Sequence, residues 1–114
     1  MGRQCVSDVP VGAFLSGGVD SSAVAAAMVA TGHVPKRAYC IAFESGSMAG
    51  EGFGDDVVYA REMASRLGLD LSVITVAQPT PDDLSNLPWL LDEPTADPAA
   101  LYVEAIARAS RADG

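Results

Sequence analysis

The chain has 114 residues, of which 49% are hydrophobic, and a formal net charge of −8. This length suits one domain or part of one, and the acidic balance with scattered Lys and Arg residues argues against a nucleic-acid surface. Because no apolar stretch is long enough to span a bilayer and the N-terminus lacks the apolar core of a signal peptide, we expect a folded cytoplasmic protein with no membrane contact.

The first predicted elements are a strand at residues 11–15 and a helix that continues to about Thr31. An apolar run at residues 9–15 indicates the buried strand, and small residues at 22–30 indicate the helix. Gly32 ends this helix and Pro35 follows it, which is a usual helix terminus.

Two further strand and helix units follow at similar spacing. The predicted elements are a strand at 37–43, a helix at 55–67 closed by Gly68, a strand at 69–76, and a helix at 98–112. Alternating polar residues make the third strand edge-like, and a proline-rich stretch at 78–81 ends it. The order predicts an α/β fold in which a parallel sheet with flanking helices is joined by right-handed crossovers.

The predicted sheet is incomplete. With three strands, the very apolar first strand would lie at an edge, although a strand that feeds a glycine turn normally lies centrally. The chain stops just after a helix, at Gly114, where a fourth strand is expected. We therefore expect the front part of a domain, able to self-associate through the exposed first strand.

A seven-residue segment between the first strand and its helix carries the clearest chemical signal. It consists of Ser16, Gly17, Gly18, Val19, Asp20, Ser21 and Ser22. The glycines let the backbone turn tightly, and the first N–H groups of the helix have no partner within it. Together with the helix dipole and the serine hydroxyls, these groups predict a phosphate cradle.

Two common phosphate-binding loops are excluded. A Walker A loop needs a Lys that is absent near Gly18, and the spaced glycines at 50–54 lack the dinucleotide-binding register. Asp20 would repel phosphates unless a divalent cation lay between them, so it implies Mg²⁺. The alternative is that Asp20 and Ser21 merely cap the helix, although a cap needs only one such residue.

Other polar residues receive structural interpretations. Asp55 and Asp56 are interpreted as acids at the start of a helix rather than as ligands. Cys5 and Cys40 have no C-x-x-C spacing and are interpreted as reduced thiols in or near the core.

The segment SGGVDSS at 16–22 resembles the signature of the PP-loop ATP pyrophosphatases. The lead-in SDVPVG at 7–12, the IAF strand at 41–43 and the segment LDEPTADPAAL at 91–101 resemble the synthetase domain of glutamine-hydrolysing asparagine synthetases. The resemblance implies an adenine-nucleotide alpha-hydrolase-like fold of the HUP type. It also implies that residues 1–114 form a partial ATP-binding domain with its PP-loop at 16–22.

The resemblance implies roles for particular positions. Residues 16–22 would hold the pyrophosphate end of ATP and its Mg²⁺, with Asp20 facing the metal through the phosphates. Leu15 and Ile41 would offer backbone groups to adenine, while a plain core role for Ile41 stays open. Glu93 and Asp97 would lie on the substrate side or act as helix caps.

The implied reaction adenylates the side-chain carboxylate of aspartate and transfers ammonia from glutamine, giving asparagine, AMP and pyrophosphate. The family's nucleophilic cysteine follows the initiator Met, where this chain has Gly2, so we expect no glutaminase domain here. The family's second acidic loop and catalytic lysine are expected beyond Gly114, so no catalytic residue is assigned and the isolated chain is expected to be inactive. The alternatives are a non-catalytic nucleotide-binding module, or a related ligase or cyclase that adenylates another carboxylate.

Overall fold

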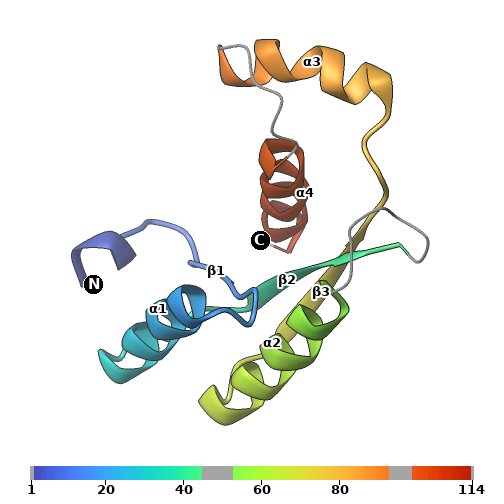
Figure 1. Cartoon of the computed structure of the whole chain (residues 1–114). Coiled ribbons are helices and arrows are strands. Elements are labelled where there is room, and N and C mark those ends of the chain that lie inside the picture. The colour runs from blue at the N-terminus through green and yellow to red at the C-terminus, as the bar shows by residue number, and fades with distance from the viewer. Residues whose placement is uncertain (1, 45–52, 93–98, 114) are drawn as a thin grey trace.

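The structure is a computed structural model that describes residues 2–44, 53–92 and 99–113. Its centre is a sheet of three parallel strands, β1 (Ala13–Phe14), β2 (Ala38–Phe43) and β3 (Leu71–Val76), in the order β1-β2-β3. Figure 1 shows this sheet with helices on both sides. The predicted α/β class is confirmed, and the first strand lies at an edge of the described sheet, as expected.

β1 contains only two residues, whereas the sequence predicts a strand at 11–15. The backbone on either side of β1 nevertheless continues to pair with the β2 segment. Lys36 N donates to Val11 O at 2.8 Å, and Leu15 N donates to Tyr39 O at 2.8 Å. These bonds extend the pairing on both sides of β1, over the region in which the apolar run predicted a strand. Leu15, which follows β1, is buried, whereas the Phe14 side chain is 47% exposed.

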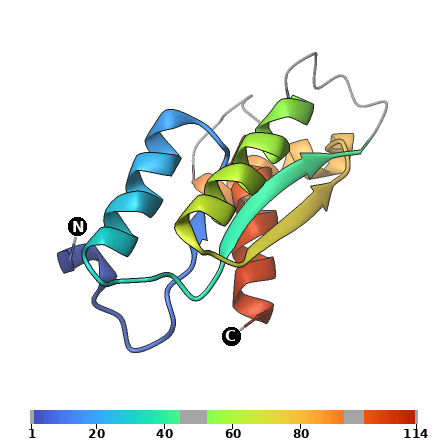
Figure 2. The same ribbon diagram turned by 90° about the horizontal axis from the view of Figure 1, so that it is seen from below.

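The helices form two layers around the sheet. Helices α1 (Val19–Ala30) and α2 (Phe53–Leu67) lie side by side on one face, and α4 (Ala99–Ala112) covers the other (Figures 1 and 2). A further helix, α3 (Pro81–Leu91), packs against α4, and a short 3-10 helix (Gly2–Cys5) precedes β1. Among the described residues, no helix has both the length and the apolar character needed to cross a membrane.

The main core lies between the sheet and the α1–α2 layer. Its buried members are small or medium-sized: Leu15, Ala25, Ala38, Cys40, Ala60, Ala64 and Leu69. Alanines on both helices bring their backbones close to the sheet, which a larger side chain would prevent. This close packing places the first turns of α1 and α2 near the carboxyl ends of the strands.

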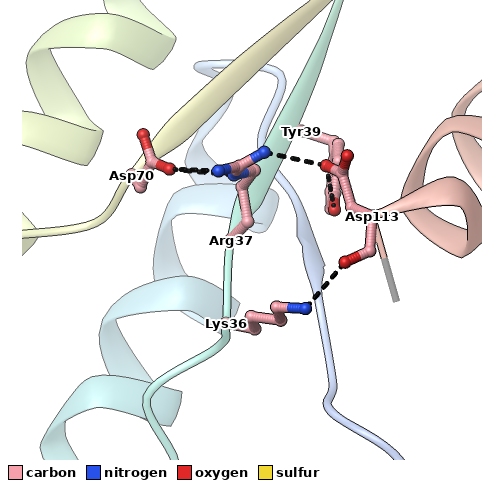
Figure 3. A network of polar contacts seen from close by, with 5 residues as sticks. All are labelled: Lys36, Arg37, Tyr39, Asp70 and Asp113. Carbon is pink, nitrogen blue, oxygen red and sulfur yellow. Dashed lines mark hydrogen bonds and ion pairs between the residues drawn. The ribbon is translucent and has the colours of Figure 1, made fainter.

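A polar network joins α4 to the amino end of the sheet (Figure 3). Asp113 Oδ2 accepts hydrogen bonds of 2.9 Å from both Arg37 Nη1 and Tyr39 Oη, and Asp113 O accepts one of 2.7 Å from Lys36 Nζ. Arg37 also pairs with Asp70 at 2.8 Å. The Tyr39 hydroxyl, followed by Arg37, lowers the pKa of Asp113. The network ties the end of α4 to β2 at the edge opposite the carboxyl ends.

Helix α3 is not among the predicted elements, because the proline-rich stretch at 78–81 predicts only the end of the third strand. Thr80 is its N-cap, and Pro81 begins the helix, where a missing N–H costs nothing. Thr80 N donates to Asp83 Oδ2 at 2.8 Å while Asp83 N donates to Thr80 Oγ1 at 3.3 Å, which is a reciprocal capping box. Asp92 ends the helix in a left-handed conformation with φ of 57°.

Candidate functional site

The loop between β1 and α1 is pressed against α2. Gly17 has a φ of +80°, a conformation that glycine adopts at little cost. A Cβ atom at Gly17 would lie 2.7 Å from Asp56 O and 2.8 Å from Tyr59 Cβ. Position 17 therefore requires glycine for two independent reasons, its φ and the close approach of α2.

Serine hydroxyls fold this loop back onto the first turn of α1. Ser16 Oγ and Ser21 Oγ lie 3.0 Å apart, and Ser16 N donates to Ser21 Oγ at 3.2 Å. Ser21 Oγ also donates to Gly18 O at 3.3 Å. These links connect the loop to the first turn of α1 at several points.

The N-terminus of α1 has no side-chain cap. Its N-cap residue is Gly18, and the first bond of the helix runs from Ser22 N to Gly18 O at 3.1 Å. The N–H groups of Val19, Asp20 and Ser21 precede that bond, so they have no partner within the helix. The alternative that Asp20 or Ser21 caps the helix is therefore wrong. A turn of unpaired amides at the positive end of a helix dipole suits an anion.

A pocket of about 210 Å³ adjoins the loop at the carboxyl ends of β1 and β2. Its lining residues come from both strands, the loop, α2 and α4: Phe14, Leu15, Ser16, Tyr39, Cys40, Ile41, Phe43, Asp56, Tyr102 and Ile106. Leu15 and Ile41, predicted as partners on adjacent strand ends, are thus brought together. Parallel α/β sheets bind ligands in this position, beyond the carboxyl ends of the strands.

The main-chain groups of Ile41 face the pocket side of β2. Arg37 O and Tyr39 O accept bonds from the β1 segment, so every second residue of β2 directs its polar groups toward β1. Ile41 continues this alternation, but the pairing with the first strand ends at Leu15. The N–H and C=O of Ile41 therefore extend past β1 toward open space. Ile41 is half-buried and lines the pocket.

The walls of the pocket are mostly apolar. Phe43 and Tyr102 form an edge-to-face pair with ring centroids 5.0 Å apart, and Ile106 lies one turn farther along α4. These three side chains were not predicted as site residues, because only the packing of α4 over β2 brings them there. A flat, apolar ligand group fits such walls.

Asp56 also lines this pocket, which the interpretation as a helix-start acid did not foresee. Among the described residues, no hydrogen bond or ion pair joins its carboxylate to another group. Burial raises the pKa of the neighbouring Cys40 thiol, and the Asp56 carboxylate raises this pKa further. The negative charge of Asp56 is therefore felt at the inner wall of the pocket.

Asp20 lies exposed on the first turn of α1. Within the described part of the chain, no three His, Cys, Asp or Glu side chains gather closely enough to hold a metal ion. A cation at Asp20 would therefore take its other oxygen ligands from water or from bound phosphates, which is compatible with the interpretation through phosphates. Glu93 and Asp97, the two expected substrate-side residues, lie outside the described residues.

Comparisons with known proteins agree on one family. The family model described as asparagine synthase matches residues 1–114. Asparagine synthetase [glutamine-hydrolyzing] 1 of Bacillus subtilis is 34% identical over 106 residues, which cover 92% of this chain and 16% of that protein. Putative asparagine synthetases [glutamine-hydrolyzing] of Mycobacterium bovis and Mycobacterium tuberculosis are 40% identical over 113 residues, covering 92% of this chain and 15% of theirs. The chain thus spans about 15% of the length of these curated relatives.

Proposed function

The chain belongs to the asparagine synthase family, and on this premise we propose that its loop and pocket bind ATP for an asparagine synthetase-type reaction. One observation supports this most strongly: Ser16 lines the apolar pocket and is hydrogen-bonded to Ser21 in the first turn of α1, where the amides are unpaired. ATP has the matching arrangement, a polyanion joined through a sugar to a flat base. In this proposal, residues 1–114 are part of an ATP-binding domain.

The loop at 16–22 would hold the pyrophosphate end of ATP. The N–H groups of the first turn, with the hydroxyls of Ser16 and Ser21, face the charge that grows on the leaving pyrophosphate during adenylation. Because these groups are fixed by the loop before binding, they need little reorganisation as the reaction proceeds. Asp20 would bind Mg²⁺ that neutralises the phosphate oxygens.

The pocket would hold adenine between Ile41 and the Phe43–Tyr102 pair. The N–H of Leu15 is already bonded to Tyr39 O, so the carbonyl of Leu15 would accept from the adenine amine. Ile41, whose main-chain groups extend past β1, would supply the matching donor and acceptor. Recognition of a base by strand ends needs no particular side chain, which suits the apolar residues at both positions.

The full reaction forms an adenylate on the side-chain carboxylate of aspartate and then transfers ammonia derived from glutamine to it. This chain would contribute nucleotide binding and charge stabilisation, with Glu93 and Asp97 on the substrate side. The relatives that share the reaction's name are about six times longer than the matched segment, as the 16% coverage shows. We therefore assign the capture of ATP, rather than complete turnover, to these residues.

Calorimetric titration with ATP in the presence of Mg²⁺ tests the proposal. Wild-type protein should bind ATP only with Mg²⁺ present, and Asp20→Ala should weaken that binding by about tenfold or more. The circular dichroism spectrum should not change, because Asp20 is exposed. Asp8→Ala, which removes another exposed carboxylate, serves as the control for net charge. An unchanged dissociation constant in Asp20→Ala would contradict the role of the loop.

A further inference from the structure

We propose that Asp56 accepts a hydrogen bond from the ribose hydroxyls of the bound nucleotide and makes the site selective for ribonucleotides. The inference rests on the proposed function, because it assumes that the pocket and the loop hold ATP. Asp56 lies outside the loop at 16–22, and it is not one of the two strand-end residues proposed to bind adenine.

The position of Asp56 is the first argument. Its backbone touches the phosphate loop, since a Cβ atom on Gly17 would lie 2.7 Å from Asp56 O. The same residue lines the pocket together with Ser16 and Cys40. Asp56 therefore lies where the loop meets the pocket. In a nucleotide whose phosphates lie on the loop and whose base lies in the pocket, the ribose occupies that border.

The chemistry of a carboxylate is the second argument. An ionised carboxylate only accepts hydrogen bonds, and ATP offers donors only at its ribose hydroxyls and its adenine amine. The phosphates are acceptors and would repel the charge. The adenine amine would lie by Leu15 and Ile41, deeper along the strands, which leaves the ribose as the donor for Asp56. Carboxylates bind ribose hydroxyls in the same chemical sense in dinucleotide-binding folds.

The availability of the carboxylate is the third argument. Asp56 is half-buried, and no described residue donates a hydrogen bond to its side chain. Its charge reaches the inner wall of the pocket, where it raises the pKa of Cys40. Because no described protein group occupies the carboxylate, it is free to accept a hydrogen bond from a ligand hydroxyl in exchange for water.

The test compares ATP with 2′,3′-dideoxy-ATP, which lacks both hydroxyls, by calorimetry with Mg²⁺. Wild-type protein should bind the dideoxy analogue about tenfold or more weakly than ATP. In Asp56→Ala and in the isosteric Asp56→Asn, ATP should lose most of this advantage while the affinity for the analogue stays nearly constant. Glu62→Gln removes an exposed carboxylate that pairs with Arg66 on the same helix, and it should behave as wild type.

The outcomes separate the inference from the proposed function. If wild-type protein binds neither nucleotide, the proposed function is wrong, and the inference that depends on it is wrong as well. If wild-type protein binds both equally, ATP binding stands and the role of Asp56 is overturned, even should the variants fail to fold. A third nucleotide, purine riboside triphosphate, lacks the adenine amine. If Asp56→Ala weakened the binding of ATP but not of this analogue, Asp56 would contact the base, and the inference would be overturned.

Discussion

Tyr39 on β2 donates a hydrogen bond of 2.9 Å to Asp113, the residue that follows α4 (Figure 3). This bond lies toward the amino end of the sheet, and it helps to hold the helix that carries Tyr102 and Ile106 over the pocket, which Tyr39 also lines. A hydrogen bond between a residue of the pocket and the end of α4 thus helps to set the position of one wall of the site.

Removal of the hydroxyl should loosen this attachment. Tyr39→Phe keeps the buried ring but leaves Asp113 without one donor, and we expect the thermal midpoint to fall by about 3 °C. Tyr59→Phe is the matched control, because the Tyr59 side chain is 56% exposed and its hydroxyl has no described partner. Differential scanning calorimetry on both variants measures the effect. Equal midpoints for the two variants would show that the hydrogen bond contributes nothing.

The lowered pKa of Asp113 predicts a loss of stability in acid. Its donors, first Tyr39 and then Arg37, favour the ionised form in the folded state, so the unfolded chain binds the proton at higher pH. The contribution is therefore complete above the ordinary aspartate pKa of about 3.9 and is lost as the pH falls through the lower folded value. Asp113→Asn should flatten the decline of the urea midpoint between about pH 5 and pH 2. Asp8→Asn, which alters an exposed carboxylate, should follow the wild-type curve, and a parallel curve for Asp113→Asn would contradict the assignment.

Elements with a clear repeat could be predicted from the sequence. The apolar spacing at 55–67 corresponds to α2, and glycines with positive φ follow at the predicted helix ends, Gly32 at 77° and Gly68 at 67°. Helix α3 is not among the predicted elements, because the proline-rich stretch at 78–81 indicates only the end of the third strand, whereas Pro81 in fact opens the helix. The capping box of Thr80 and Asp83 was the local signal that could have revealed α3.

The residues of the candidate site also differ in how far the sequence could predict them. The loop is contiguous in the chain, so a single segment suggested its chemistry and structure. Leu15 and Ile41 were paired because carboxyl ends of parallel strands meet at one edge. Asp56 and Tyr102 belong to helices on opposite faces of the sheet, and only tertiary packing brings them to one pocket. Neither the spacing of apolar residues nor a local sequence motif indicates that two such distant residues line the same pocket.

Because α2 lies close to the loop at Gly17 but not at Gly18, we expect alanine substitution to destabilise the protein at Gly17 only. Gly17→Ala combines a positive φ with contacts below 3 Å to backbone, so it should destabilise the protein by about 1–3 kcal/mol and abolish nucleotide binding. Gly18→Ala meets only Ser16 Oγ at 3.4 Å and has an ordinary φ of −71°, so the fold should tolerate it. Urea denaturation of both variants provides the comparison. Equal stability would mean that the loop does not rest on α2 as described.

Leu87 should be the main anchor of α3. Its side chain is fully buried, and truncation of a buried leucine typically costs about 2–5 kcal/mol, so Leu87→Ala should lower the unfolding free energy by that amount. Leu84→Ala, on the same helix but 43% exposed, should cost less than about 1 kcal/mol. Chemical denaturation measures both values. A small effect at Leu87 would indicate that α3 is not packed on α4 in solution.

Cys40 offers a direct probe of the pocket. Its buried thiol has a raised pKa, first from desolvation and then from Asp56, so little reactive thiolate forms at neutral pH. Alkylation by iodoacetamide, followed by mass spectrometry, should therefore be slow at Cys40 and should accelerate as the pH rises. Bound ATP with Mg²⁺ should slow it further, because Cys40 lines the pocket, while the half-buried Cys5 serves as the internal control. Asp56→Asn should speed the reaction at Cys40, since it removes a charge that opposes the thiolate. If ATP protected Cys5 and Cys40 equally, the nucleotide would be acting on the whole fold rather than on this pocket.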